Sequence, residues 1–274
     1  MAFAGEVAWI TGASSGIGAA LARGVAARGG HVVLSGRNRD ALDALAGTLA
    51  GESLVLPFEV TDRAAAGAAA DAAWDWAAAR SGGIGMLVNN AGISQRSLAV
   101  DTAMAVYDRI IAVDLMAPIA LTQALLARMV ARRAGRIVMI SSVAGKVGVP
   151  MRTAYCAAKF GLIGYADALR AETAGQGLSV HVVTPGSVRT DVSRNALTAD
   201  GSARGASDRA IENGLDPDAV AATMLDAIAA GQREIIIATG IEQAMAEMRR
   251  TPDALFDQIA ALAVGYADRM AEKA

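Results

Sequence analysis

The chain has 274 residues, of which 54% are hydrophobic and 19% charged, so it carries enough apolar material for a large buried core. Its formal net charge of −2 gives no indication of a nucleic-acid or anionic-membrane partner. The single cysteine, Cys156, cannot form an internal disulfide, which is typical of a reducing compartment. The first residues resemble no signal peptide, and charges interrupt the apolar stretches, so we expect a cytoplasmic protein without a transmembrane segment.

Short runs rich in valine, isoleucine and leucine alternate with longer, alanine-rich segments of helical period. Nearly continuous apolar runs are typical of strands buried on both faces of a parallel sheet. The alternation predicts an α/β fold with a doubly wound sheet of seven mostly parallel strands and helices on both faces. The predicted strands span residues 7–11, 31–35, 53–58, 85–89, 136–141, 180–185 and 234–238. The predicted helices span residues 16–28, 39–50, 63–80, 102–132, 153–175 and 217–230.

No Pro/Ser-rich linker, charge run or internal repeat divides the chain, so residues 1–240 are predicted to form one domain. Residues 188–216 are polar and rich in turn-forming residues. Residues 241–274 are predicted to form an amphipathic helical extension that packs on the same domain or on a partner subunit. Covering a cleft or lying on a membrane surface are the alternatives. The apolar positions of this extension are Met245, Met248, Leu255, Phe256, Ile259 and Leu262.

A glycine-rich turn, TGASSGIG at residues 11–18, follows the first predicted strand and opens a helix. Gly12 permits the tight turn, Gly16 allows the backbone to approach a pyrophosphate, and Gly18 allows close packing of helix and strand. The helix N-terminus would offer N–H groups to the phosphates. Since the spacing is G-x-x-x-G-x-G, a turn that binds nothing is the alternative, but its place after the first strand favours a dinucleotide.

The end of the second predicted strand, LSGRNRD, bears on the choice of dinucleotide. An acidic residue there would bind the ribose 2′-hydroxyl of NAD, but the position is occupied by Gly36. Arg37 and Arg39 follow, and a guanidinium suits a 2′-phosphate. Ser14 and Ser15 could donate hydroxyl groups to the same phosphate. NADP(H) is therefore the preferred cofactor, and NAD(H) is the alternative.

Three residues later in the chain suit proton transfer at a carbonyl oxygen. Tyr155 and Lys159 are four residues apart and share one face of a predicted helix, and Ser142 ends the fifth predicted strand. A tyrosine titrates near pH ~10, and a nearby ammonium favours its phenolate. Ser142 could hydrogen-bond a substrate oxygen beside Tyr155. The alternative is a serine that caps a loop and two residues on a helix surface.

Taken in chain order, four motifs make this sequence resemble the short-chain dehydrogenase/reductase family, in its single-domain branch, over residues 6–240. They are TGASSGIG (11–18), NNAG (89–92), Ser142 with Tyr155-x-x-x-Lys159, and PGSVRTD (185–191). The resemblance implies a Rossmann-type sheet, with Tyr155 as the acid/base, Ser142 orienting the substrate oxygen, and Lys159 binding the nicotinamide ribose. The cofactor site implied by the motifs and the resemblance comprises Gly12, Ser14, Ser15, Gly16, Ile17, Gly18, Arg37, Glu59, Val60, Asn89, Ala91, Gly92, Tyr155, Lys159, Pro185, Gly186, Val188 and Thr190.

The sequence departs from the family pattern at two positions. Asp114 stands where the family usually has an asparagine that holds a water in the proton relay through Lys159. A carboxylate accepts but does not donate, so we expect Asp114 to be a catalytic residue of an altered relay. Glu59 stands where an aspartate usually contacts adenine, and either Glu59 contacts it here or Asp62 caps the next helix.

The substrate side is less defined. The candidate substrate residues are Ser94, Arg96, Arg152 and Val192. The resemblance implies that the positions of Arg96 and Arg152 face the substrate cleft, although solvent exposure or a salt bridge is the favoured interpretation for both arginines. The family also implies that residues 188–216 form a mobile substrate lid, and that subunits pair through helices near 102–132 and 153–175. We therefore expect a homodimer or homotetramer. His31 and His181 lack a third partner, so no metal site is expected.

These residues predict an NADP(H)-dependent oxidoreductase that interconverts a small carbonyl compound, a ketone or aldehyde, and an alcohol. One alternative is an NAD-dependent alcohol dehydrogenase. The other, which Asp114 motivates, is a catalytically impaired cofactor-binding scaffold or redox sensor.

Overall fold

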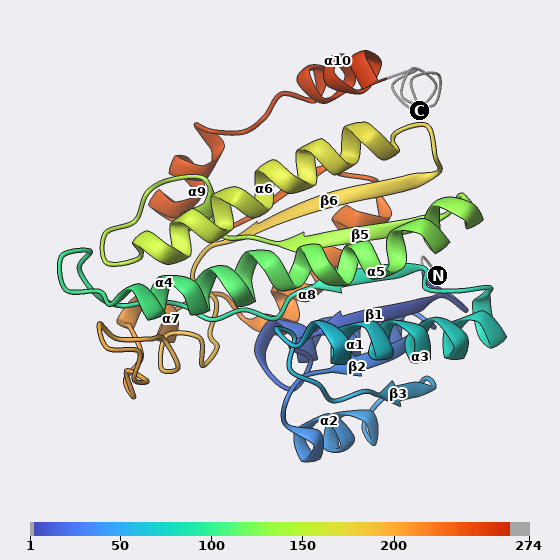
Figure 1. Cartoon of the computed structure of the whole chain (residues 1–274), viewed down its shortest axis with the longest axis horizontal. Helices are drawn as coiled ribbons and strands as arrows, with labels where there is room; N and C mark the ends of the chain where they lie inside the picture. Colours follow the sequence, from blue (N-terminus) through green and yellow to red (C-terminus); the bar gives the residue numbers. More distant parts are fainter. Residues whose placement is uncertain (1–2, 264–274) are drawn as a thin grey trace.

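The computed structural model describes residues 3–263, and a seven-stranded sheet lies at its centre (Figure 1). The strand order is β3-β2-β1-β4-β5-β6-β7, and every neighbouring pair is parallel. The strands are β1 (Val7–Thr11), β2 (His31–Ser35), β3 (Ser53–Val55), β4 (Met86–Asn89), β5 (Gly135–Ile140), β6 (Leu178–Pro185) and β7 (Glu234–Ile237). The predicted doubly wound, Rossmann-type α/β fold is confirmed.

Strand β1 shows why the strands are apolar along their whole length. Ala8 and Ile10 face one hydrophobic core, whereas Val7 and Trp9 face the other, and each is at most 2% exposed. Because helices cover both faces of the sheet, both sets of alternating side chains are buried. The first core is closed by α1 (Gly16–Ala27), α2 (Arg39–Ala46) and α8 (Pro217–Ala229), and the second by α3 (Arg63–Ser81), α5 (Ala117–Arg132) and α6 (Thr153–Thr173).

Three predicted elements differ from the observed ones by more than two residues. Helix α2, predicted to reach residue 50, ends at Ala46 with Gly47 as its C-cap. Strand β3 ends at Val55 instead of continuing to Phe58. The N–H groups of Leu56 and Phe58 still donate to the Leu34 and Gly36 carbonyls, and Pro57 between them lies on the open edge of the sheet, where a missing N–H is tolerated. The long helix predicted at 102–132 is divided into α4 (Met104–Ile111), a π-helical turn η1 (Ala112–Met116) and α5. Single π-turns within helices are frequent at functional sites, and this one contains Asp114.

The strand order places a crevice beside the carboxyl end of β1. The chain first builds outward from β1 to β2 and β3, and then crosses to β4 on the other side of β1. Ligands of doubly wound sheets bind at such a reversal. The strands end on the left in Figure 1, where α7 (Arg209–Glu212) and the connections around it lie.

Residues 240–263 pack on the same fold as the sheet and its helices. Helix α9 (Gly240–Glu247) follows β7 and lies near η2 (Val143–Gly145), and α10 (Asp253–Ala263) lies along α6. Phe256 of α10 is 9% exposed, and the Arg170 guanidinium of α6 lies 4.3 Å from its ring centre. The side chain of Leu262 lies outside the described residues.

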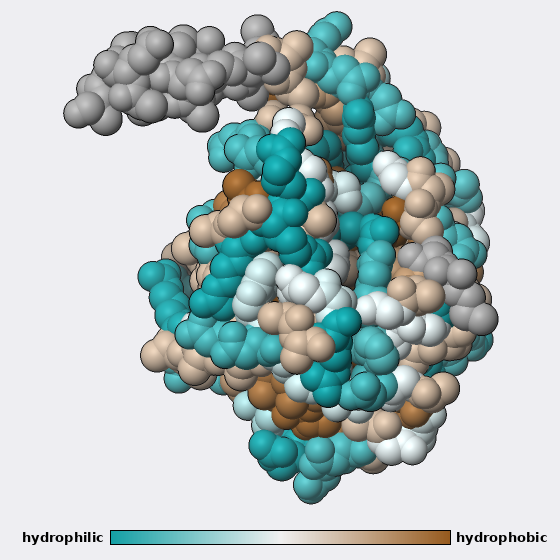
Figure 2. All heavy atoms as spheres, turned by 90° about the vertical axis from the view of Figure 1, so that its right-hand side faces the viewer, coloured by the Kyte–Doolittle hydropathy of each residue, from teal (hydrophilic) through white to brown (hydrophobic). Residues whose placement is uncertain are grey.

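One described helix, Met104–Arg132, is long and apolar enough to cross a membrane by length and composition alone. Its most apolar window is 44% buried, and it packs on α3 and α6. Figure 2 shows the side on which the strands begin, where the surface is mainly hydrophilic with small, separate hydrophobic patches.

Candidate active site

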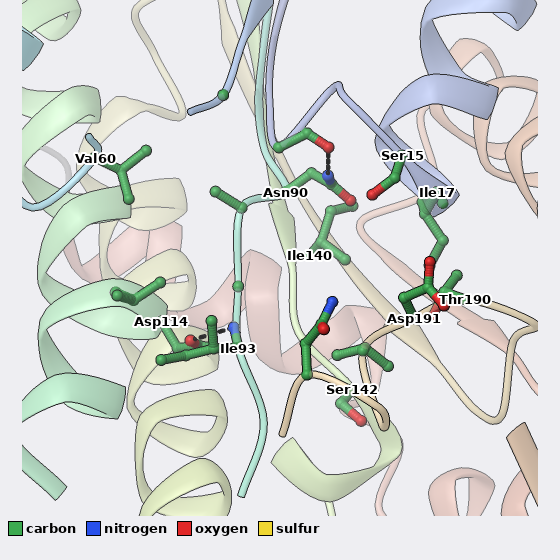
Figure 3. A pocket seen from close by; sticks show the side chains of 18 of the residues that line it. Ser15, Ile17, Val60, Asn90, Ile93, Asp114, Ile140, Ser142, Thr190 and Asp191 are labelled. Atoms are coloured by element: carbon green, nitrogen blue, oxygen red, sulfur yellow. Dashed lines mark hydrogen bonds between the residues drawn. The ribbon is translucent and has the colours of Figure 1, made fainter. Parts of the chain in front are cut away.

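A cleft of about 550 Å³ opens at the carboxyl ends of β1, β4, β5 and β6. The glycine turn after β1 forms one wall, and the π-turn η1 lies on the opposite side (Figure 3). Ser15, Ile17, Thr190 and Asp191 gather on one side of the view, while Asp114 and Ile93 face them. The cleft therefore joins segments that are more than 150 residues apart in the sequence.

The glycine turn has the backbone that its sequence predicts. Gly12 and Gly16 have φ angles of +65° and +53°, a region that residues with a Cβ seldom adopt. A Cβ at Gly16 would lie 2.9 Å from Cγ2 of Thr190, so the turn also packs closely on the loop after β6. Gly18 is not among the residues that line the cleft. A Cβ at Gly18 would lie 2.3 Å from the Gly12 carbonyl oxygen, so Gly18 has the predicted role of close packing.

Thr11 and Asn90 connect the glycine turn to the loop after β4, and neither was predicted from the sequence as a site residue. The Thr11 hydroxyl accepts hydrogen bonds from the N–H groups of Asn90 and Ala91 at 3.0 and 3.1 Å. The Asn90 amide donates to the Thr11 carbonyl at 2.8 Å. Asn89, predicted to support cofactor and sheet, lies beneath the cleft, where its amide donates to the Thr122 hydroxyl at 3.1 Å. The asparagine pair in the NNAG motif was the sequence signal from which the role of Asn90 could have been predicted.

The far end of the cleft is lined by Gly36, Arg37, Glu59 and Val60. Arg37 is 67% exposed and lies 3.8 Å from the Glu59 carboxylate, so its guanidinium is accessible to an anion. Asp62 accepts hydrogen bonds from two N–H groups as the N-cap of α3. The interpretation that Asp62 caps the next helix is therefore confirmed, and Glu59 lines the cleft.

Ser142, Tyr155 and Lys159 line the opposite end of the cleft together. Ser142 follows β5 and caps η2, where its hydroxyl accepts from the Ala144 N–H at 3.1 Å. Tyr155 and Lys159 lie on one face of α6, and the Lys159 Nζ lies 5.5 Å from the centre of the Tyr155 ring. These three side chains can present a phenol and a hydroxyl to one substrate oxygen.

Asp114 touches Lys159 directly. Its Oδ2 lies 3.0 Å from the Lys159 Nζ, and its Oδ1 accepts from the Ile93 N–H at 2.9 Å. Asp114 is fully buried and Lys159 is 4% exposed. The Lys159 Nζ also donates a hydrogen bond to the Ile140 carbonyl at 3.0 Å, whereas its contact with Asp114 Oδ2 is an ion pair without hydrogen-bond geometry. Lys159 lines the cleft, where its ammonium can donate to a ligand.

These contacts set the ionisation of the site. Burial raises the pKa of Tyr155, the Asp114 charge raises it further, and Lys159 and the Ser142 hydroxyl offset only part of the rise. Burial alone would lower the pKa of Lys159, but the charges of Asp114 and Tyr155 raise it above its ordinary value. Burial raises the pKa of Asp114, with Lys159 and the Ile93 N–H in opposition.

A family model described as short chain dehydrogenase matches residues 6–201. The chain belongs to the short-chain dehydrogenase/reductase family. The Bos taurus protein named dehydrogenase/reductase SDR family member 7B is 39% identical over 258 residues, which cover 92% of this chain and 79% of that relative. The chain is therefore an oxidoreductase of this family.

Solved structures of the family have the same fold. A short-chain dehydrogenase from Sphingobium yanoikuyae, in complex with NADPH, matches with a TM-score of 0.74 and 27% identity over 94% of both chains. A short-chain dehydrogenase/reductase from Burkholderia phymatum, in complex with NAD, has a TM-score of 0.79 and 24% identity, covering 92% of this chain and 98% of its own. At this identity the second match concerns the fold alone. Both coenzymes thus occur on this fold.

The residues of the cleft fit the nicotinamide dinucleotide that the family resemblance implies. The glycine turn and the N-terminus of α1 would hold the pyrophosphate, because the open backbone of Gly12 and Gly16 leaves N–H groups accessible. The Lys159 ammonium would hold a ribose hydroxyl. The other predicted cofactor residues on the cleft wall are Ser14, Ser15, Ile17, Arg37, Glu59, Val60, Ala91, Gly92, Tyr155, Pro185, Gly186, Val188 and Thr190.

Only one of the four predicted substrate residues, Val192, lines the cleft. Ser94 is 6% exposed, and its carbonyl accepts from the Leu197 N–H at 2.8 Å. Arg96 and Arg152 both pair with Asp208, so the favoured salt-bridge interpretation describes them. The cleft wall instead includes Arg109, Asn195, Leu197, Ala203 and Ile211.

Asp208 ties the 188–216 segment to the rest of the fold. Its carboxylate pairs with Arg96 from the loop after β4 and lies 3.6 Å from Arg152, just before α6. Within the segment, Arg204 pairs with it and the Ser193 hydroxyl donates to it at 2.9 Å. The ion pair of Arg96 and Asp208 thus connects two segments that are 112 residues apart in the sequence. Over residues 3–263, no group of three or more His, Cys, Asp or Glu side chains could hold a metal ion.

Proposed function

We propose that this protein is an NADP(H)-dependent oxidoreductase that interconverts a small ketone or aldehyde with the corresponding alcohol. The observation that carries the proposal is the convergence of Ser142, Tyr155 and Lys159 on the cleft that also contains the glycine turn. Membership of the family and the nicotinamide coenzymes bound by similar structures support it.

In this proposal the chain's own residues manage the proton and the substrate orientation. The Tyr155 phenol donates a proton to the carbonyl oxygen during reduction and accepts it back during oxidation. The Ser142 hydroxyl, which already accepts from the Ala144 N–H, donates to the same substrate oxygen and orients it. Lys159 holds the ribose. When bound, the dinucleotide supplies or accepts the hydride.

The preference for NADP(H) rests on the residues after β2. Gly36 offers no carboxylate to a ribose 2′-hydroxyl, and the exposed guanidinium of Arg37 lies on the cleft wall. A 2′-phosphate forms forked, charge-assisted hydrogen bonds with such a group. Since Glu59 lies only 3.8 Å from Arg37, a bound phosphate must compete with a carboxylate for it. NAD(H) is the alternative coenzyme.

Residues 188–216 are proposed to act as the substrate lid of one catalytic domain, with Asp208 holding the lid in place. We also propose a cytoplasmic homodimer or homotetramer. The exposed side chains of Val100, Met104 and Met116, near the predicted pairing helices, support self-association. Light scattering of the purified protein would measure the subunit number, and a monomer at micromolar concentration would contradict the proposal.

The decisive experiment is a screen of ketones, aldehydes and alcohols, followed through the absorbance of NADPH or NADH. Turnover should fall by about 10²- to 10⁴-fold in Tyr155→Phe while coenzyme binding remains. Tyr165→Phe is the matched control, since Tyr165 lies on the same helix and its hydroxyl accepts from the Gln123 amide instead. Tight coenzyme binding without turnover on any substrate would favour the scaffold or redox sensor.

A further inference from the structure

The buried pair of Asp114 and Lys159 changes the electrostatics of the tyrosine beside it. In the relay that the family resemblance implies, an asparagine stands at position 114 and Lys159 presents an uncompensated positive charge. Here the carboxylate Oδ2 lies 3.0 Å from the ammonium, and both side chains are almost completely buried. Because a buried pair is poorly screened, Asp114 cancels much of the field by which Lys159 would stabilise a phenolate.

Two neighbours favour Asp114 as a carboxylate, against the burial that raises its pKa. Its Oδ1 accepts from the Ile93 N–H, and its Oδ2 forms an ion pair with the Lys159 ammonium. The π-turn η1 directs the side chain inward. Gly92 provides the space, since a Cβ there would lie 3.0 Å from Oδ2 and 3.4 Å from Nζ. The ion pair is therefore a built feature of the site.

We propose that Asp114 is a positioning residue that keeps Tyr155 protonated, so that the enzyme stands ready as a proton donor and reduces carbonyls over a wide pH range. The proposal rests on the assignment of Tyr155 as the acid/base. The equilibrium of the reaction at a given pH depends only on the reactants. Asp114 therefore shifts the pH range in which each direction is active. Compared with an enzyme without this charge, reduction remains active to higher pH, and oxidation requires a more alkaline solution.

Four side chains act on the Tyr155 phenol. Burial and the charge of Asp114 favour the neutral form, Cys156 acts in the same direction, and Lys159 and Ser142 favour the phenolate. Arg109 and Asp191 also line the cleft but are not among the groups that shift Tyr155. Among these groups, Asp114 carries the negative charge that opposes the effect of Lys159 on the Tyr155 phenol, so its removal should favour the phenolate.

The test is an ultraviolet titration of tyrosinate in the coenzyme-free protein, over the pH range in which circular dichroism shows that it is folded. The chain has four tyrosines, so the signal of Tyr155 is the difference between each protein and its Tyr155→Phe counterpart. In Asp114→Asn the midpoint should move to lower pH. Asp108→Asn, on exposed positions of α4, makes the same charge change outside the cleft and should leave the midpoint unchanged.

The kinetic counterpart is the pH profile of kcat/KM in both directions, which reports the acid and base of the substrate-free enzyme. The alkaline limit of reduction and the acid limit of oxidation should both move to lower pH in Asp114→Asn. An unchanged or higher midpoint, or limits that stay in place, would overturn the proposal. Asp114→Ser serves if the asparagine variant fails to fold. Since the titration needs no substrate, it decides the role of Asp114 even if the screen for turnover fails.

Discussion

Glu242 of α9 accepts two hydrogen bonds from Ser187, one from its backbone N–H at 2.8 Å and one from its hydroxyl at 2.9 Å. Ser187 follows Pro185 and Gly186, which line the cleft after β6. A Cβ at Gly186 would lie 2.4 Å from the Glu242 Oε2, so the contact requires glycine. The first helix of the C-terminal extension thus holds the loop that the family resemblance assigns to the nicotinamide end.

Replacing Glu242 by alanine should weaken coenzyme binding. Two hydrogen bonds to a carboxylate are lost, and each such bond contributes about 1.5–3 kcal/mol. We expect the coenzyme Kd to rise by about tenfold or more, measured by calorimetry. Glu247→Ala on the same helix is the control, because Glu247 pairs with Arg250 away from the cleft. Equal Kd values for the two variants would show that α9 does not support the loop.

The sequence predicted the elements whose signal is local. The apolar runs identified all seven strands, and the four-residue spacing of Tyr155 and Lys159 on α6 placed their side chains on one face. The direct contact of Asp114 with Lys159 was not predicted, because it depends on a π-turn within a helix that reads as continuous. The contact between Arg96 and Asp208 spans 112 residues and leaves no periodic signal. Pairings of this kind are decided by tertiary structure.

Coenzyme choice should shift toward NAD(H) in Gly36→Asp. A Cβ at Gly36 would lie 3.5 Å from the Ser14 Oγ and 3.8 Å from the Leu42 Cδ2, which are ordinary contacts, so the position accommodates a side chain. A carboxylate there would bind a ribose 2′-hydroxyl and repel a 2′-phosphate. We expect the ratio of kcat/KM for NADH over NADPH to rise on the order of tenfold or more. Gly47→Asp, outside the cleft, should leave the ratio unchanged. A preference that stays the same in both variants would contradict the assignment of this end of the cleft.

Gly92→Ala should impair turnover through the Asp114–Lys159 pair. The new methyl group would lie 3.0 Å from the Asp114 Oδ2, so the carboxylate or Lys159 must move by a few tenths of an ångström. Small displacements of catalytic groups are costly, and we expect kcat to fall by about tenfold. The control is Gly164→Ala at an exposed position of α6, where a Cβ meets no neighbouring atom within 4 Å outside the helix's own backbone. It should raise the unfolding free energy by about 0.5–1 kcal/mol and leave kcat unchanged. A fall in kcat of equal size in both variants would argue against a specific role of Gly92.

The lid should loosen when Asp208 is replaced by asparagine. Its carboxylate joins Arg96 and Arg152 of the main fold to Arg204 of the 188–216 segment, and the asparagine loses most of that attraction. We expect faster trypsin cleavage within the segment and a higher KM for the carbonyl substrate, with kcat changed less. Glu212→Gln in α7, an exposed position four residues further on, should leave the cleavage rate as it is. Unchanged cleavage in Asp208→Asn would show that the segment is held by other contacts.

His181 in β6 should make the fold less stable in mild acid. Its Nδ1 lies 2.6 Å from the Gln232 carbonyl, which only accepts, so Nδ1 carries the proton and Nε2 accepts from the Ser179 hydroxyl at 2.9 Å. Burial lowers the pKa of His181, and the charges of Arg136 and Arg170 act in the same direction.

The folded state therefore binds this proton less readily than the unfolded chain, whose histidine titrates near pH ~6.5. The stabilisation from neutral His181 is fully present above that pH and declines as the pH falls toward the lower folded-state pKa. Melting temperatures from about pH 8 to about pH 5 should fall more steeply for the wild type than for His181→Gln, which cannot titrate. Carboxylates that titrate in this range contribute equally to both curves, so their difference isolates His181, and parallel curves would exclude this role.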